Sequence, residues 1–196
     1  MPYLTKNEVL AMLRERRHND VIEQHLIAGL PFAFKDDPRA YQDFSGTLSA
    51  QFRTPLEDIS DIGSGRIGFS LDPDQFGTPF RPNSDVDTVI VNSAMFDRAW
   101  FQLYNIGSKR FSLERRVQTA FQEHRTNNVF FGFIVPKLLP GVVSLSALWF
   151  NVFQEVGGRI RSLAGHDING RLYRTWDHVK AHQRYSLDAI AAKFAR

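Results

Sequence analysis

Cysteine is absent from the 196 residues of this chain. Its absence excludes a disulfide scaffold, a zinc site built on cysteine and a thiol nucleophile, and it is compatible with a reducing compartment. An excess of one charge sign is also lacking, because 24 Lys and Arg residues face 21 Asp and Glu residues, for a formal net charge of +3. This mildly basic balance permits attraction to nucleotides or nucleic acid without requiring it.

Long hydrophobic runs are lacking as well. Residues 1–6 contain no apolar stretch of the kind found in secretion signals. The longest apolar region, 130–150, is interrupted by Pro136, Pro140 and Gly141, so it predicts a strand, a turn and a helix and not a membrane span. We therefore expect a cytoplasmic protein that does not enter a membrane.

The composition that is present, 43% hydrophobic and 23% charged, is typical of a globular protein. The order of helix and strand signals predicts an α+β fold with a small mixed sheet flanked by helices. We expect a single domain over 1–196. Within it, N-terminal helices occupy 1–54, a motif-bearing core occupies 55–135, and further helices and a strand occupy 136–196.

Capping and turn residues locate the elements. Thr5 with Glu8 forms a capping box, and Asp37 before Pro38 marks a second helix start. Prolines and a glycine in 71–84 predict a loop. The expected helices span 5–27, 39–52, 93–104, 113–124, 144–163 and 186–194. The expected strands span 59–62, 86–91, 129–135 and 171–176.

Two carboxylates begin the most clearly marked strand. Asp85 and Asp87 stand two residues apart, so alternation places both on one face. Such a pair repels itself and is usually tolerated where a cation lies between the carboxylates, and hard divalent ions prefer oxygen ligands. Aspartates in an exposed turn are the alternative. The apolar run that follows the pair favours a metal site.

A glycine turn follows the strand expected over 59–62. In Gly63-Ser64-Gly65-Arg66, glycine lets backbone amides approach a phosphate, Ser64 adds a hydroxyl donor, and Arg66 adds a charge-assisted hydrogen bond. The turn is not a Walker A loop, because the Gly-Lys-Ser/Thr ending is missing, and it is not a dinucleotide-binding fingerprint. An ordinary glycine turn is the alternative reading.

Taken together, 63–70 and 84–91 resemble the polymerase-β-like nucleotidyltransferase superfamily, whose pattern is an apolar residue, Gly-Ser, a spacer and an acid-apolar-acid strand. They also resemble a bacterial subgroup with Gly-Phe-Ser and a proline-rich spacer before Ser-Asp-x-Asp. The resemblance implies transfer of a nucleoside monophosphate from a nucleoside triphosphate, with Mg²⁺ or Mn²⁺ as cofactor. It implies that Asp85 and Asp87 are metal ligands and that Gly63 and Ser64 bind phosphate.

Two features depart from that family. The spacer is long, so 71–83 looks like an insertion that serves as a lid or a partner surface. The family's third carboxylate lies on a later strand, yet the strand expected over 129–135 contains no acid. Asp167 and Asp177, which flank the strand expected over 171–176, are the candidates for this third carboxylate.

Several other polar residues are ambiguous. His178 and His182 have the i, i+4 spacing of a zinc pair, but the acid of a His-Glu-x-x-His motif is missing, which favours a surface helix. Arg171, Arg174 and Arg184 either face a nucleotide or an acceptor, or lie at a solvated strand edge.

Three functions remain open at this point. The first is a metal-dependent nucleotidyltransferase with RNA, a protein, a small molecule or another nucleotide as acceptor. The second is a catalytically inactive nucleotide-binding or partner-binding module, such as an antitoxin, a sensor or a defence component, and the missing third acid supports it. The third is a nucleic-acid-binding protein in which the motif occurs by chance.

Overall fold

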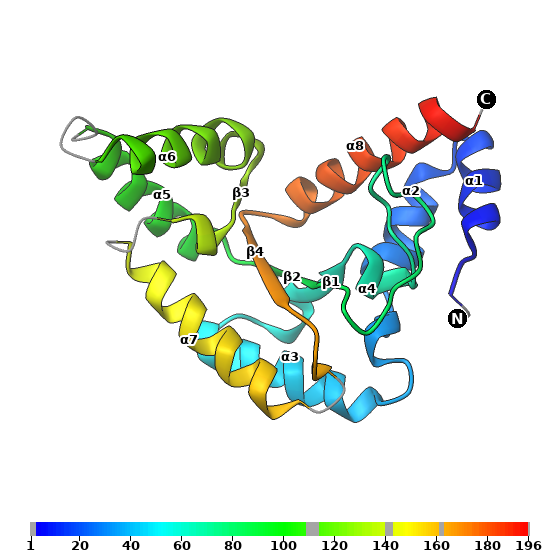
Figure 1. Cartoon of the computed structure of the whole chain (residues 1–196), viewed down its shortest axis with the longest axis horizontal. Coiled ribbons are helices and arrows are strands. Elements are labelled where there is room, and N and C mark those ends of the chain that lie inside the picture. The colour runs from blue at the N-terminus through cyan, green and yellow to red at the C-terminus, as the bar shows by residue number, and fades with distance from the viewer. Residues whose placement is uncertain (1–2, 109–113, 140–142, 161–162, 196) are drawn as a thin grey trace.

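A computed structural model of the chain describes residues 3–108, 114–139, 143–160 and 163–195. In these residues the fold is α+β, with eight α-helices around one open, mixed sheet of order β1-β2-β4-β3 (Figure 1). β1 is antiparallel to β2, β2 is parallel to β4, and β3 is antiparallel to β4. The strands are β1 (Ile59–Ile62), β2 (Val86–Val91), β3 (Phe133–Ile134) and β4 (Ile168–Tyr173).

The helices differ widely in length. A π-helical segment, Val21–Ile27, follows α2 directly. In the described parts of the chain, no helix combines the length and hydropathy needed to span a membrane. The helices are α1 (Lys6–Arg14), α2 (His18–Asp20), α3 (Pro38–Phe52), α4 (Ser64–Ile67), α5 (Ser93–Ser108), α6 (Arg115–Asn127), α7 (Ser144–Arg159) and α8 (Trp176–Phe194).

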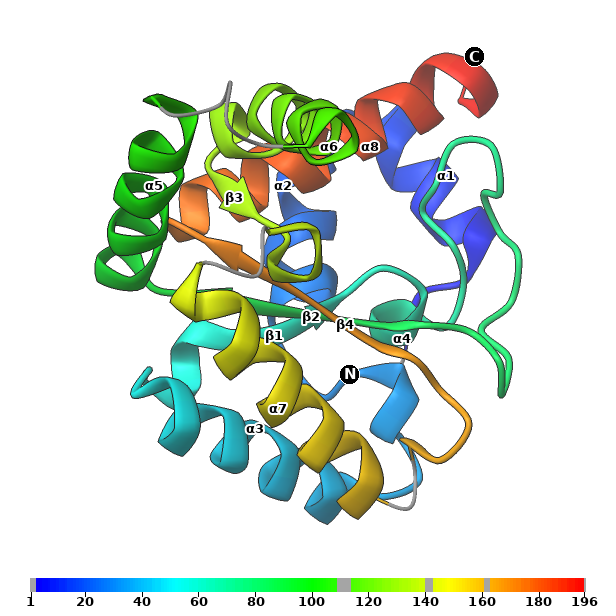
Figure 2. The ribbon, with the colours of Figure 1, turned by 60° about the vertical axis from the view of Figure 1, so that its left-hand side comes forward.

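Alternation along the strands gives the sheet two different faces. On the face covered by α3 and α7, Ile90 of β2 and Leu172 of β4 join the main core (Figure 2). On the opposite face, Val89 and Tyr173 pack against Val179 of α8. The odd-numbered residues of β2 and β4, which include Asp87, therefore face α8.

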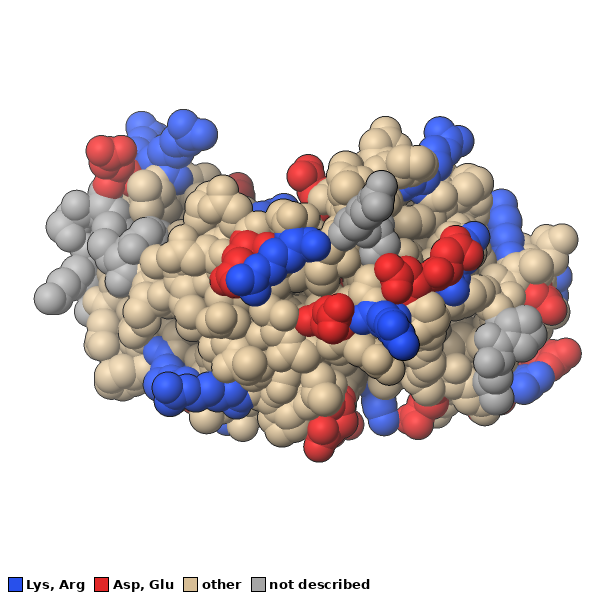
Figure 3. All heavy atoms as spheres, turned by 90° about the horizontal axis from the view of Figure 1, so that it is seen from below, with Lys and Arg blue, Asp and Glu red and all other residues tan. Residues whose placement is uncertain are grey.

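The outer side of the α3 and α7 layer carries charges of both signs. Seen from below, Lys and Arg side chains lie among Asp and Glu side chains and are separated by uncharged surface (Figure 3). Nucleic-acid binding depends on gathered positive charge. This face therefore does not favour the nucleic-acid-binding hypothesis.

Most of the predicted elements are confirmed. Thr5 forms the expected capping box with Glu8, and the Asp37 side chain caps α3 by accepting from the amide of Ala40. The strands predicted over 59–62 and 86–91 have those bounds. The predicted α+β class, with helices on both faces of a small mixed sheet, is confirmed as well.

Four element predictions are wrong in part. The helix predicted over 5–27 is interrupted before α2, where Arg16 has a φ of 58°. The strand predicted over 129–135 is reduced to β3, because a 3₁₀ turn ends at Gly132 with a φ of 80°. The strand predicted over 171–176 lies earlier, as β4, because α8 begins at Trp176 and not at Ser186.

Three predicted helices differ at their ends, and the start of one of them cannot be assessed. α5 runs to Ser108, beyond the predicted end at 104, and α7 ends at Arg159, before the predicted end at 163. For the helix predicted over 113–124, the start at Leu113 lies outside the described residues. The corresponding helix, α6, is described from Arg115 to Asn127 and so runs beyond the predicted end.

Candidate functional site

A cavity of about 520 Å³ opens on the α8 face of the sheet. The turn after β1 contributes Gly63 and Ser64, and the start of β2 contributes Asp85 and Asp87. β4, the loop over 70–79 and α8 form the remaining walls. The two halves of the predicted motif, far apart in sequence, therefore face one cavity.

Antiparallel pairing of β1 with β2 brings these halves together. Ile62 lies opposite Asp87 in the register, so the next residue, Gly63, approaches the carboxylate. A Cβ at position 63 would lie 3.2 Å from Asp87 Oδ2. Gly63 also has a φ of 70°, which glycine adopts readily. Glycine is needed here for its backbone conformation and for the space that it leaves beside Asp87.

Side chains from β4 and from the segment before α7 partly neutralise the acid pair. Asp85 Oδ2 accepts a hydrogen bond of 2.9 Å from Asn169, whose Oδ1 in turn accepts one of 2.6 Å from Lys137 Nζ. Arg171 lies 3.9 Å from Asp87 Oδ1. Burial raises the pKa of the Asp87 carboxyl, Arg171 opposes the rise, and Asp85 adds to it. Because burial outweighs the cations already present, a further cation would stabilise the ionised form of Asp87.

The donor set fits one hard divalent ion. Among the described residues, Oδ1 of Asp85 and Oδ2 of Asp87 have no hydrogen-bond donor. Mg²⁺ in nucleotide sites commonly takes one or two carboxylates plus substrate phosphates. No cluster of three or more histidine or acidic side chains suited to a metal occurs in the described chain. Asp85 and Asp87 are the paired carboxylates of this cavity that could hold an ion, and Asp72 of the loop over 70–79 also lines it.

The structure places both candidates for the third carboxylate away from this cavity. Asp167 is exposed directly before β4, where its carbonyl accepts from the amide of Val86, and it lines a different cavity. Asp177 is exposed in the first turn of α8, beyond the other end of β4. The strand parallel to β2 is β4, whose Asn169 lies opposite Asp87 in the register and donates to Asp85, and whose Arg171 lines the cavity.

Arg66, predicted to bind phosphate, is oriented differently. It is only 1% exposed, and its guanidinium donates to the backbone carbonyls of His25, Ala28 and Gly29. These carbonyls lie at the end of the π-helical segment, so the hydrogen bonds of Arg66 connect α4 to that segment. Gly65 is buried too and does not line the cavity. Of the predicted phosphate turn, the structure directs Gly63 and Ser64 to the site.

α8 supplies a wall that the sequence did not predict. His182, Gln183 and Ser186 line the cavity, and Gln183 is only 6% exposed. His182 Nδ1 lies 2.6 Å from the Tyr173 hydroxyl, and its ring stacks on Phe133. Burial lowers the pKa of His182 to about 4, so this wall is uncharged at neutral pH. The early start of α8 brings these residues into the site.

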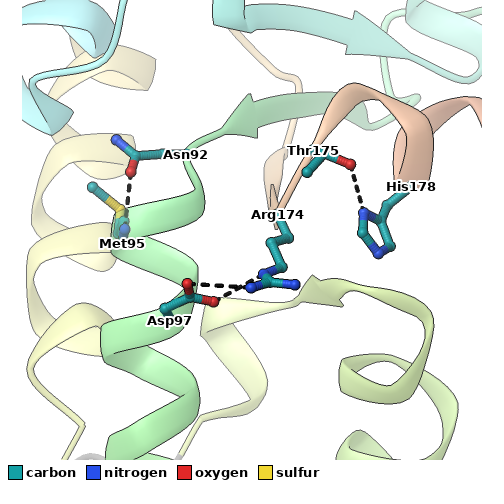
Figure 4. A network of polar contacts seen from close by, with 6 residues as sticks. All are labelled: Asn92, Met95, Asp97, Arg174, Thr175 and His178. Carbon is teal, nitrogen blue, oxygen red and sulfur yellow. Dashed lines mark hydrogen bonds and ion pairs between the residues drawn. The ribbon is translucent and has the colours of Figure 1, made fainter.

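The opposite end of the sheet contains a separate polar network. Thr175 Oγ1 lies 2.7 Å from His178 Nδ1, and Arg174 forms an ion pair of 2.9 Å with Asp97 of α5 (Figure 4). His178 and His182 thus have different partners, an arrangement that does not support a zinc pair. Arg171, in contrast, lines the cavity as the sequence allowed.

Comparison of the chain with protein-family models, curated proteins and solved structures found no match.

Proposed function

We propose that this protein is a metal-dependent nucleotidyltransferase, which transfers a nucleoside monophosphate from a nucleoside triphosphate to an acceptor such as RNA, a protein or a small molecule. One observation carries the proposal: the glycine turn at Gly63 and the acid pair Asp85 and Asp87 line one cavity. The cavity volume of about 520 Å³ lies in the range of small-molecule sites. A cytoplasmic location, where nucleoside triphosphates are available, is part of the proposal.

Each polar residue then has a definable task. Asp85 and Asp87 would hold Mg²⁺ or Mn²⁺ through their free oxygens. The ion, when bound, supplies positive charge to the triphosphate and polarises an acceptor hydroxyl. The Ser64 hydroxyl donates to a phosphate oxygen, and the Arg171 guanidinium stabilises charge that develops on the leaving pyrophosphate.

The remaining walls position the reactants. The loop over 70–79 and α8 face the phosphate turn across the cavity, so they limit the access of water to a bound nucleotide. Part of the expected insertion over 71–83 thus lines the site, and in the proposed function it serves as a lid. Its Asp72, Gln75 and Thr78 offer polar groups to the acceptor.

A second function, nucleotide binding without transfer, is favoured by a specific observation. Asn169 and Arg171 occupy the positions of β4 beside the acid pair, where the resemblance implies a third carboxylate. Neither side chain can accept a proton from an acceptor hydroxyl at neutral pH. In that function the protein would be a sensor or a partner-binding module.

A labelling experiment tests both functions. The protein is incubated with each labelled nucleoside triphosphate, Mg²⁺ or Mn²⁺ and cell extract. The variant Asp85→Asn with Asp87→Asn removes the charge but keeps the shape, and Asp43→Asn, exposed on α3 across the sheet, is the matched control. Transfer that is lost only in the double variant supports the enzyme. Nucleotide binding without transfer refutes the enzyme and supports the second function, whereas absence of both refutes both.

A further inference from the structure

A second cavity, of about 360 Å³, lies between α5 and α6 and shares no lining residue with the proposed active site. Trp100, Leu103 and Tyr104 of α5 form one wall, and Phe121 of α6 forms the other. Trp100 and Tyr104 are 47% and 61% exposed, which is high for such large rings. The cavity has the size and the apolar lining of a site for a small aromatic molecule.

The second observation is a polar side chain in this apolar lining. His124 of α6 is 3% exposed, and within the described parts of the chain neither of its ring nitrogens has a hydrogen-bond partner. Buried polar groups are nearly always paired, so an unpaired one indicates a missing partner. Burial lowers the pKa of His124 to about 4, and the neutral ring offers one donor and one acceptor. Both nitrogens are shielded in the structure, so pairing with a ligand requires the ring to turn about its outer torsion, which is broadly distributed for histidine.

The third observation is the charge of the lining. Arg125 is exposed and lines the cavity, and none of the described lining residues is acidic. An anionic group at this position would meet a guanidinium that suits carboxylate geometry. The ligand is thus expected to combine an aromatic ring, a hydrogen-bonding group and a negative charge.

We propose that this cavity binds a small aromatic carboxylate whose ring carries a hydroxyl group. The ring packs against Trp100 and Phe121, the hydroxyl pairs with His124, and the carboxylate pairs with Arg125. This site is independent of the proposed nucleotidyltransferase activity, and its test does not use that activity.

Calorimetric and NMR titrations of the full chain test the site with three probes: para-hydroxybenzoate, benzoate and phenol. We expect para-hydroxybenzoate to bind with one-to-one stoichiometry and about tenfold more tightly than either probe that lacks one group. The carbon and nitrogen resonances of the His124 ring are expected to shift on binding. Absence of binding of all three probes at millimolar concentration overturns the proposal.

Variants assign the two polar contacts. His124→Phe is expected to abolish the higher affinity of para-hydroxybenzoate relative to benzoate. Arg125→Gln is expected to abolish its higher affinity relative to phenol. Arg116→Gln, exposed on α6 outside the cavity lining, is the matched control and leaves all affinities unchanged. Because Arg125 is exposed, its variant keeps the test decisive even if His124→Phe does not fold. Affinities that neither variant changes overturn the proposal.

A neutral probe separates small molecules from protein partners. N-acetyl-tyrosinamide carries the same phenol ring but no carboxylate, and it represents a tyrosine side chain of a partner protein. We expect it to bind more weakly than para-hydroxybenzoate. Tighter binding that is lost in His124→Phe would assign the cavity to a protein partner and overturn the small-molecule proposal.

Discussion

At Gly63 the backbone has a φ of 70° and a ψ of −150°, a conformation that residues with a Cβ rarely adopt. We predict that Gly63→Ala lowers the free energy of unfolding by roughly 1–3 kcal/mol through this strain. The new Cβ, 3.2 Å from Asp87 Oδ2, would also displace the carboxylate. Nucleotide affinity, measured by titration with Mg²⁺ present, is therefore expected to fall by at least about tenfold.

A glycine elsewhere in the chain is the control for this prediction. Gly46 lies within α3, and a Cβ there would meet open space. Gly46→Ala is expected to raise the free energy of unfolding by roughly 0.5–1 kcal/mol, because alanine loses less backbone entropy in a helix. Its nucleotide affinity is expected to stay unchanged. If Gly63→Ala also bound the nucleotide with wild-type affinity, this result would contradict the close approach of the turn to the acid pair.

Asp61 is the other residue whose environment makes a specific prediction. It is fully buried on the α3 face of the sheet, where Oδ1 accepts from the Thr88 hydroxyl and Oδ2 has no partner among the residues that the structure describes. Burial raises the pKa of its carboxyl to about 7. The folded state therefore binds the proton more tightly than the unfolded state, whose pKa is about 3.9. As a result, the free energy of unfolding falls as the pH rises from about 4 to about 7.

We predict that Asp61→Asn, which keeps an oxygen for Thr88, stabilises the protein above about pH 7, by up to roughly 4 kcal/mol. The advantage is expected to vanish near about pH 4, where the wild-type carboxyl is protonated. Urea denaturation of both proteins at several pH values measures the difference. An advantage that is the same at every pH would show that charge burial is not its cause.

At the scale of elements, the sequence predicted those helices and strands whose formation depends on residues close to one another in the chain. The β-branched run over 86–91 and the cap of α3 were predictable because their causes lie within a few residues of chain. The pairing of β2 with β4 was not predictable, because it joins segments far apart in sequence. The side-chain direction of Arg66 was hidden for the same reason, since its partners are carbonyls at the end of the π-helical segment.

The pairing of β2 with β4 leads to a prediction about metal binding. Asn169 donates to Asp85 Oδ2, so Asn169→Asp replaces a donor by a third carboxylate beside the acid pair. Without metal, repulsion is expected to lower the free energy of unfolding by roughly 1–3 kcal/mol. With Mn²⁺, we expect an affinity about tenfold higher than in the wild type, because hard cations bind more tightly as carboxylates are added.

Electron paramagnetic resonance titration with Mn²⁺ measures this affinity. Asn151→Asp, which adds the same charge at an exposed position of α7, is the control and is expected to leave the affinity unchanged. A lower Mn²⁺ affinity in Asn169→Asp than in the wild type would contradict a metal site at Asp85 and Asp87 that β4 can complete.

At the scale of the whole molecule, α8 connects parts that are distant in sequence. Near its start, Val179 packs with Tyr173 on the sheet face opposite α3 and α7, and farther along, Leu187 and Ile190 pack with Val9 of α1 (Figure 1). The segments 1–54, 55–135 and 136–196 contribute to the same hydrophobic clusters. We therefore expect the chain to unfold as one cooperative unit, as the predicted single domain requires.

Leu187→Ala tests this cooperativity. Leu187 of α8 is fully buried against the N-terminal helices. Its truncation is therefore expected to lower the free energy of unfolding by roughly 2–5 kcal/mol. With Trp100 and Trp176 replaced by Phe, the fluorescence of Trp149 reports on the main core across the sheet, and far-UV circular dichroism reports on all helices. If the chain is one cooperative unit, Leu187→Ala shifts the urea transitions seen by fluorescence and by circular dichroism together. Leu56→Ala, at a residue 55% exposed, is the control and changes the free energy of unfolding from either signal by no more than roughly 0.5 kcal/mol. If the circular dichroism transition instead separates from the fluorescence transition of Trp149, the N-terminal helices and α8 unfold independently of the sheet, and the prediction is wrong.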